Sequence, residues 1–142
     1  MADNARATIT INAEPKAVMD AIADFPAYPQ WAGVERTEVL DPGEGGRARR
    51  VRLWVDAKIV KDEYVLDYDW DDDRAVTWNL VEGKQQSYQR GTYALRDLGG
   101  RTEVTYDLTL EMKAKLPGLI RRTAQSTIMD RALRGLKKRV ES

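Results

Sequence analysis

The chain contains no histidine and no cysteine among its 142 residues. Histidine is the usual general base near neutral pH and the commonest metal ligand, while cysteine supplies disulfides, thiolate ligands and thiol nucleophiles. A histidine-based catalytic triad, a thiolate metal site and a disulfide scaffold are therefore excluded. We expect no bound metal and no cofactor, and any acid–base chemistry would fall to a carboxylate, a tyrosine or a bound water.

The sequence also lacks an excess of charge, since 23 Lys and Arg residues stand against 23 Asp and Glu residues. This balance gives no overall field to attract nucleic acid or an anionic membrane. No stretch approaches the roughly 20 apolar residues of a membrane span, and the N-terminal residues lack the apolar run of a signal peptide. We expect one domain over residues 1–142, in a cytoplasmic monomer or homodimer that binds no nucleic acid and has no integral membrane association.

Phenylalanine is almost absent, with one Phe against four Trp and six Tyr. Most of these rings fall between residues 54 and 106, where they alternate with charged residues. A buried phenol or indole must find a hydrogen-bond partner or lose free energy, so a dry core does not need such polar tips. The pattern favours a face that is partly apolar and partly wet, as in a ligand cavity. Alternatively, Trp and Tyr are good strand residues that simply pack a sheet.

The N-terminal part of the chain predicts a strand followed by short helices. A β-branched alternation predicts a strand over residues 7–11. Asn12 is a suitable N-cap and Pro15 fits a first helical turn, after which apolar residues recur at helical spacing until Pro26. Residues 25–33 are broken by prolines, which favours a short helical turn or a loop.

From residue 34 to residue 112 the apolar period changes to two, and turn signals divide the stretch into an antiparallel meander. The expected strands are 34–40, 47–56, 58–69, 75–81, 87–96 and 102–112. Pro117 and Gly118 then open a helix of about 24 residues. At about 1.5 Å per residue this helix is about 36 Å long, which is enough to cross the sheet.

Alternation along these strands predicts which side chains face the last helix. In the final strand Val104, Tyr106 and Leu108 share one side, and we assign that side to the helix. The same rule turns Trp54 and Tyr88 outward. It turns the following aromatic residues inward: Tyr64, Tyr68, Trp70, Trp78, Tyr93 and Tyr106.

Two charged residues fall in phase with the inward sets. Arg49 precedes Val51 and Asp62 precedes Tyr64, so both are candidates to line a cavity. A β-bulge would shift the phase by one residue and turn them outward. For most members of the basic cluster at residues 47–52, solvated side chains are the default interpretation because acids lie nearby.

The last helix differs between its halves. Residues 121–127 are polar and small, whereas the later half is strongly amphipathic. Gln125 lies on the apolar stripe, where a helix that only filled a core would carry Leu or Ile. We therefore expect the first half to roof a cavity and the second half to seal it. Gly135 in mid-helix costs about 1 kcal/mol relative to Ala, and close packing on the sheet would explain it.

Four segments of the chain carry a family resemblance. They are residues 15–31, Gly91-Thr92-Tyr93, residues 102–106 and residues 132–141. In these segments the chain resembles the START-like (SRPBCC, Bet v 1-like) superfamily, in its polyketide cyclase/dehydrase and lipid-transport branch. The resemblance implies an α+β helix-grip fold, in which a curved antiparallel sheet of about seven strands wraps around a long C-terminal helix, with two short helices after the first strand. It also implies a hydrophobic tunnel between sheet and helix for lipids, quinones, hormones or polyketides.

The sequence leads to one preferred function and two alternatives. We expect a non-catalytic binder or carrier of a hydrophobic small molecule, such as a lipid, quinone or polyketide-like compound. The alternatives are a polyketide cyclase or aromatase that shapes a poly-β-ketone chain for aldol closure, and a protein-interaction module. For a cyclase, Asp62 or a tyrosine-held water is the best available proton acceptor, and no catalytic residue is assigned. The candidate ligand-binding residues are Trp31, Arg49, Tyr64, Tyr68, Trp78, Tyr93, Tyr106 and Gln125.

Overall fold

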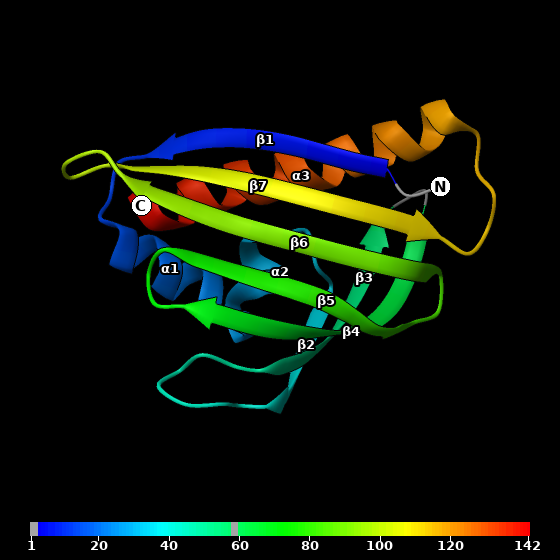
Figure 1. Ribbon diagram of the computed structural model, residues 1–142, viewed down its shortest axis with the longest axis horizontal. Helices are drawn as coiled ribbons and strands as arrows, with labels where there is room; N and C mark the ends of the chain where they lie inside the picture. Colours follow the sequence, from blue (N-terminus) through cyan, green and yellow to red (C-terminus); the bar gives the residue numbers. More distant parts are fainter. Residues whose placement is uncertain (1–2, 58–59) are drawn as a thin grey trace.

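A computed structural model describes residues 3–57 and 60–142 of the chain. It contains one seven-stranded antiparallel sheet and a long C-terminal helix (Figure 1). The strands are β1 (Asp3–Ile11), β2 (Arg36–Asp41), β3 (Arg50–Ala57), β4 (Val60–Asp71), β5 (Ala75–Gly83), β6 (Gln86–Asp97) and β7 (Thr102–Met112). The helices are α1 (Pro15–Ala23), the 3₁₀ turn η1 (Phe25–Ala27), α2 (Tyr28–Trp31) and α3 (Gly118–Glu141).

The order of these elements confirms the predicted α+β helix-grip fold. The strands follow one another across the sheet as β1-β7-β6-β5-β4-β3-β2, so only β1 lies out of sequence, beside β7. Helix α3 runs behind the sheet alongside β1 and β7 (Figure 1). Strand β1 is longer than predicted because it pairs with β7 from Asp3 to Ile11. The start of the strand expected at residue 58 lies outside the described residues.

The predicted N-cap of the first helix is wrong. Helix α1 begins at Pro15, and Glu14 occupies the capping position without a side-chain hydrogen bond. The backbone N–H of Asn12 instead donates to Glu141 Oε2 at 2.7 Å. This bond joins the end of β1 to the end of α3, so Asn12 fixes the two elements to each other.

The concave face of the sheet alternates as predicted. In β7 the residues Val104, Tyr106 and Leu108 are buried between half-buried neighbours. On the convex face Tyr88 is exposed, and the guanidinium of Arg36 lies 4.3 Å from the ring centroid of Trp54. The core under the sheet is closed by α1 and by the second half of α3, through Val18, Met19, Ile22, Met129, Leu133 and Leu136.

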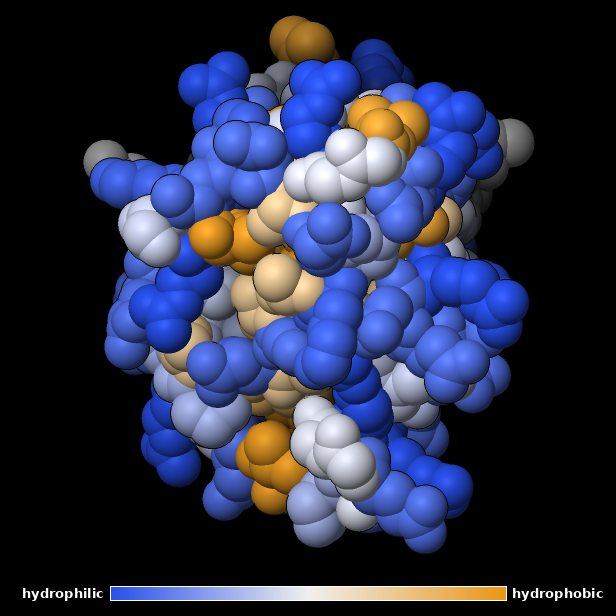
Figure 2. All heavy atoms as spheres, turned by 90° about the vertical axis from the view of Figure 1, so that its left-hand side faces the viewer, coloured by the Kyte–Doolittle hydropathy of each residue, from blue (hydrophilic) through white to orange (hydrophobic). Residues whose placement is uncertain are grey.

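The end that carries the β6–β7 turn and α1 is mainly hydrophilic, with apolar residues scattered over it (Figure 2). At the opposite end the first turn of α3 exposes Leu119 and Ile120, with 73% and 41% of their surface accessible. Among the described residues, no helix is long and apolar enough to cross a membrane.

Close packing explains the glycine in the middle of α3, but the contact differs from the one predicted. A Cβ atom at Gly135 would lie 2.0 Å from the carbonyl oxygen of Trp31. The helix therefore approaches the backbone of α2, not the sheet, and no side chain fits between them.

We predict that Gly135→Ala lowers the free energy of unfolding by about 1–3 kcal/mol, because the new methyl group must push α2 and α3 apart. Alanine is the better helix former by about 1 kcal/mol, so without the clash the same change would stabilise the protein. Gly118→Ala is the matched control, since a Cβ atom there meets only the flexible end of Arg122. Urea unfolding at equilibrium measures both variants, and an equal or higher stability of Gly135→Ala would refute the packing argument.

Candidate ligand cavity

Two adjoining cavities lie between the concave face of the sheet and α3. One, which we call the Asp62 cavity, has a volume of about 90 Å³ and reaches Asp3 and Leu116. The other, the aromatic cavity, has a volume of about 100 Å³ and reaches Tyr28 and α2. Both are lined by Val55, Tyr64, Gln89, Tyr106 and Ile128. These shared residues make the two cavities neighbouring parts of one site.

A chain of aromatic contacts forms the wall of the aromatic cavity. The ring centroids are 5.9 Å apart between Tyr68 and Trp78, 5.1 Å between Trp78 and Tyr93, and 4.6 Å between Tyr93 and Tyr106. Such tilted arrangements are favourable for aromatic pairs. Gly91 permits this packing, because a Cβ atom there would lie 2.2 Å from the Trp78 ring.

The tyrosine hydroxyls of this wall are not used to hold the fold together. Tyr28, outside the wall, donates its hydroxyl hydrogen to the carbonyl oxygen of Ile22. Within residues 3–57 and 60–142, no hydrogen bond joins the protein to the hydroxyls of Tyr64, Tyr68, Tyr93 and Tyr106. Burial raises the pKa of each of these four phenols, so they stay neutral and can both donate and accept.

The raised tyrosine pKa values predict a loss of stability at alkaline pH. In the unfolded chain a tyrosine loses its proton near its ordinary pKa of about 10, whereas the folded protein keeps the proton to a higher pH. The unfolded state then binds fewer protons, so stability is complete below about pH 10 and falls as the pH rises through the folded pKa. Each such tyrosine steepens the fall by up to about 1.4 kcal/mol per pH unit.

Tyr106→Phe tests this linkage, since it removes one ionisable group whose hydroxyl has no protein partner. Urea unfolding between about pH 9 and about pH 11 should show a shallower fall for the variant than for the unmodified protein. Parallel curves for the two proteins would show that the Tyr106 phenol ionises as readily when folded as when unfolded.

A relay of three hydrogen bonds crosses the floor of the two cavities. The indole Nε1 of Trp78 donates to Gln89 Oε1 at 2.8 Å, and Gln89 Nε2 donates to Gln86 Oε1 at 2.5 Å. Gln86 Nε2 then donates to Asp62 Oδ2 at 2.9 Å. All four side chains are buried. In each of the three bonds the donor lies on the Trp78 side and the acceptor on the Asp62 side.

Backbone N–H groups complete the environment of the Asp62 carboxylate. Oδ1 accepts from the backbone N–H of Glu63 at 2.8 Å and from that of Gln85 at 2.9 Å. With the bond from Gln86, three donors surround a carboxylate that is only 7% exposed. Hydrogen bonds of this kind compensate the burial of a charged group.

The two ends of the relay fix the orientation of both glutamine amides. An indole N–H can only donate and a carboxylate can only accept, whereas an amide does both. If Asp62 became Asn, its oxygen would still have to accept from the fixed backbone N–H groups, and its NH₂ group would face Gln86. Turning both glutamine amides over moves the conflict along the relay to Trp78, which cannot accept.

We therefore predict that Asp62→Asn and Trp78→Phe are energetically coupled although two residues separate them in the relay. Each change alone should lower the free energy of unfolding by about 1–3 kcal/mol through an unsatisfied buried group, and Trp78→Phe also loses ring packing. In the double variant both glutamine amides can turn over. Its loss in the free energy of unfolding should therefore be smaller than the sum of the two single losses by about 0.5–3 kcal/mol. A double-mutant cycle in urea measures the coupling; additive losses would mean that the amides are not fixed by the two ends.

The first half of α3 covers the Asp62 cavity, whereas Arg131 and Ala132 of the second half line the aromatic cavity. Ala124, Gln125 and Ile128 line the Asp62 cavity. Gln125 is 2% exposed, and its Nε2 donates to the carbonyl oxygens of Asp3 at 3.2 Å and Leu108 at 2.9 Å. Its amide nitrogen thus ties α3 to β1 and β7, while its Oε1 lies at the cavity without a hydrogen bond from the described residues.

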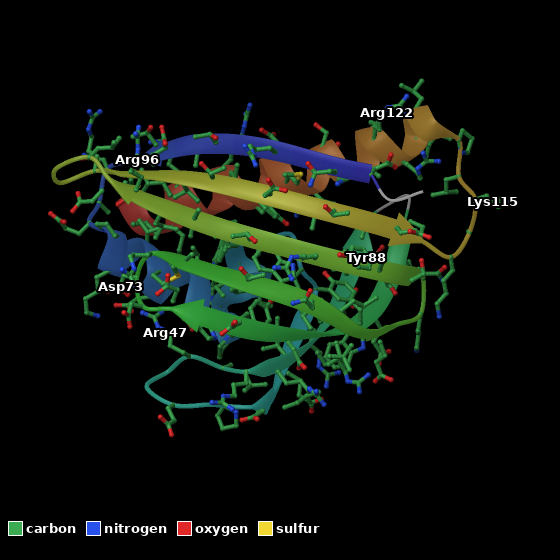
Figure 3. All side chains as sticks on the ribbon, in the orientation of Figure 1. Arg47, Asp73, Tyr88, Arg96, Lys115 and Arg122 are labelled. Carbon is green, nitrogen blue, oxygen red and sulfur yellow. The ribbon has the colours of Figure 1, made fainter. Side chains whose placement is uncertain are left out.

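An ion pair closes the rim of the Asp62 cavity. Arg121 Nε lies 2.5 Å from Asp3 Oδ2, and Arg121 Nη1 donates to the carbonyl oxygen of Leu116 at 2.8 Å. The hydrogen bond from Arg121 lowers the pKa of Asp3. Lys115 and Arg122 lie at the same end of the molecule (Figure 3). Among the described residues, no group of acidic side chains is arranged to hold a metal ion.

Six of the eight predicted ligand-binding residues line these cavities. They are Tyr64, Tyr68, Trp78, Tyr93, Tyr106 and Gln125. Asp62, the predicted inward acid, lines them too. The structure brings these residues together from β4, β5, β6, β7 and α3, but their role in binding stays a prediction.

Arg49 and Trp31 lie elsewhere. The prediction that Arg49 faces inward is wrong, because β3 begins only at Arg50 and Ala48 takes the buried position before it. Arg49 is exposed in an open groove beneath the β2–β3 connection. Trp31 is buried against Tyr28 beside a surface groove between α2 and α3, and its Nε1 has no partner within the described part of the chain.

Three residues that line the cavities are absent from the predicted ligand-binding set: Gln86, Gln89 and Ile128. Gln89 shares the phase of Gly91 and Tyr93, so alternation alone could have placed it inward. Gln86 could not be found this way, because a bulge between Gln86 and Tyr88 shifts the phase. Ile128 lines both cavities, and this position depends on how α3 crosses the sheet in the tertiary structure.

The default interpretation of the basic cluster fails for Arg47. Its guanidinium donates to the carbonyl oxygen of Met19 at 2.9 Å and pairs with Asp20 at 3.0 Å and Asp73 at 2.9 Å. It also lies 5.3 Å from the ring centroid of Trp70. Figure 3 shows Arg47 beside Asp73, where this one side chain links the β2–β3 connection to α1 and to the β4–β5 turn.

Comparison with known proteins gives a consistent result. The family model described as "Polyketide cyclase / dehydrase and lipid transport" matches residues 3–141. Among solved structures, a START superfamily protein from Mycobacterium smegmatis has a TM-score of 0.88 at 22% identity and covers 97% of both chains. The Zhui aromatase/cyclase from a Streptomyces species has a TM-score of 0.81 at 19% identity, covering 99% of this chain and 94% of its own. A Thermus thermophilus protein has a TM-score of 0.81 at 28% identity and covers 97% of both chains. Comparison with curated protein sequences gives no match.

Proposed function

Because this chain belongs to the polyketide cyclase/dehydrase and lipid transport family, we propose that it binds or carries a hydrophobic small molecule between the sheet and α3. The ligand class is a lipid, a quinone or a polyketide-like compound. The observation that carries this proposal is the cavity lining of four tyrosines, whose hydroxyls have no hydrogen-bond partner in the described part of the chain. Leaving such groups unpaired costs free energy, and a bound molecule or trapped water would satisfy them.

The lining supports binding by apolar contact with a few orienting polar groups. Val55, Leu108, Leu110, Met112 and Ile128 provide the apolar surface of the Asp62 cavity. Burial of apolar ligand surface contributes roughly 25 cal/mol per Å². The amides and phenols around it are few and lie at defined places, which is typical of small-molecule sites.

The present volumes set a limit on what fits without movement. Cavities of about 90 and 100 Å³ are smaller than the roughly 300–1,000 Å³ of usual ligand pockets. Ile128 is one of five residues that line both cavities and the one that comes from α3, so we infer that its side chain controls whether the cavities join. We infer that a larger ligand displaces Ile128 and the first turns of α3.

The direct test of the proposal is native mass spectrometry of the protein purified from cells. We expect a retained apolar molecule, identified by its mass after the protein is denatured. In parallel, the neutral fluorescent probe N-phenyl-1-naphthylamine should bind the delipidated protein and be displaced by the extracted molecule. A protein that retains nothing and does not bind the probe contradicts the proposal and favours the protein-interaction module.

The position of Ile128 gives a prediction for the same probe. Ile128→Ala should join the cavities and bind N-phenyl-1-naphthylamine about tenfold more tightly, because about two more methylene-sized groups of the probe become buried. Ile128→Phe should weaken binding by filling the junction. Ile120→Ala is the matched control, since Ile120 is exposed on the same helix. Equal affinities for all four proteins would place the probe outside these cavities.

A polyketide cyclase is the second candidate, and the position of Asp62 favours it. The carboxylate shares a cavity with the Tyr64 and Tyr106 phenols, so an acceptor for a proton and donors for a developing enolate lie together. One of the similar structures is described as an aromatase/cyclase. Incubation with a carrier-tethered poly-β-ketone tests this function: a changed ring pattern that Asp62→Asn abolishes supports the enzyme, and an unchanged pattern rejects it.

A further inference from the structure

The polar end of the Asp62 cavity differs from its apolar walls in one respect: it offers hydrogen-bond acceptors. We propose that this end selects an uncharged ligand that donates a hydroxyl hydrogen to the Asp62 carboxylate, as a phenol or an enol does. The inference rests on the proposed function and deepens it, because it names the chemical group by which the cavity discriminates between hydrophobic ligands.

The hydrogen-bond inventory of Asp62 leaves one acceptor position. A carboxylate has about four lone-pair positions. Oδ1 accepts two bonds from backbone N–H groups, and Oδ2 accepts one from Gln86. The remaining position belongs to Oδ2, and Asp62 lines the cavity. A ligand hydroxyl bound there would form a short, charge-assisted hydrogen bond.

A second acceptor lies on the opposite wall. Gln125 uses its amide nitrogen for the carbonyl oxygens of Asp3 and Leu108, which fixes the amide with Oε1 as its remaining group. Tyr64 and Tyr106 also line the cavity, and a phenol hydroxyl can donate to the oxygen of a bound hydroxyl. A hydroxyl group, which donates once and accepts, therefore matches the polar atoms on both walls.

The charges at the Asp62 end of the site disfavour an anionic ligand there. Within residues 3–57 and 60–142, no Lys or Arg forms an ion pair with Asp62. Arg121, at the rim of this end, is already held by Asp3 and by the carbonyl oxygen of Leu116. Arg131 lines the other end of the site, in the aromatic cavity. A ligand carboxylate would lie beside the Asp62 carboxylate in an apolar cavity, where like charges repel strongly. A free fatty acid with its head group at this end is therefore disfavoured.

Three probes with the same ring system separate these possibilities. 2-Naphthol is neutral near pH 7 and donates a hydroxyl hydrogen, 2-methoxynaphthalene has no such hydrogen, and 2-naphthoate carries a charge. Titration of the unmodified protein by calorimetry should show 2-naphthol binding about tenfold to a hundredfold more tightly than 2-methoxynaphthalene. 2-Naphthoate should bind most weakly.

Two further measurements assign the preference to Asp62. In Asp62→Asn the advantage of 2-naphthol over 2-methoxynaphthalene should fall to about onefold, while the exposed control Asp69→Asn keeps it. In the unmodified protein, 2-naphthol should shift the NMR signals of the Gln86 side-chain amide, which binds the same carboxylate, and 2-methoxynaphthalene should not. This second measurement decides the role of Asp62 even if the Asn variant does not fold.

The outcomes distinguish this inference from the proposed function. If the three probes bind with equal affinity, or if 2-naphthoate binds best, hydroxyl selection is wrong while hydrophobic binding stands. A preference for 2-naphthol that leaves the Gln86 amide signals unchanged also overturns the assignment to Asp62. If no probe binds, both the proposed function and the inference fail.

Discussion

Trp78 lies against the backbone of β6 at Gly91, and the concave face of the sheet depends on this contact. With any side chain at residue 91, a Cβ atom would come within 2.2 Å of the indole, so the ring would have to leave its place. In that place the ring packs against Tyr68 and Tyr93, and its Nε1 reaches Gln89. One glycine thus positions both the aromatic wall and the donor end of the relay.

The polar groups of the interior fall into two classes, those with a hydrogen-bond partner and those without one in the described chain. Along the relay every donor from Trp78 to Asp62 has a buried acceptor, which rigidifies the floor of the site. Along the wall, by contrast, the tyrosine hydroxyls have no partner in the described chain. A protein that needed these rings only for packing would be more stable with phenylalanine, because unpaired phenols gain nothing in a dry core. The unpaired hydroxyls therefore point to a ligand or to trapped water, whereas the paired amides point to the scaffold that holds it.

The sequence predicted the fold well because its signals are local. Period-two alternation, turn residues and the amphipathic stripe of α3 each depend on neighbours in the chain, and together they gave all seven strands in order. The inward aromatic residues followed from the same alternation. Arg49 and Gln86 did not, since the first precedes its strand and the second lies at a bulge. Both failures come from local backbone geometry, a strand start and a β-bulge, which the spacing of apolar residues does not show.

The partners of buried groups were harder to predict than their positions. Asp62 could be placed inward from its phase with Tyr64, but its acceptor role depends on two glutamines and a backbone turn from other strands. The closeness of Gly135 to an α2 carbonyl likewise needs the tertiary structure. Contacts across the sheet depend on register and curvature, which a single sequence specifies only weakly.

The two halves of α3 are held in different ways, and this bears on how a ligand larger than the present cavities is admitted. The second half touches α2 at Gly135 and fills the core with Leu133 and Leu136, so moving it would open voids. In the first half, Gln125 makes the only two side-chain hydrogen bonds from α3 to the backbone of β1 and β7 near the cavity, among the described residues. Breaking these two bonds and the Arg121–Asp3 ion pair costs about 1–4 kcal/mol. At about 25 cal/mol per Å², roughly 160 Å² of newly buried apolar ligand surface offsets the larger figure. A single aromatic side chain buries about 150–250 Å², so even a small aromatic ligand can supply the free energy that lifts the roof.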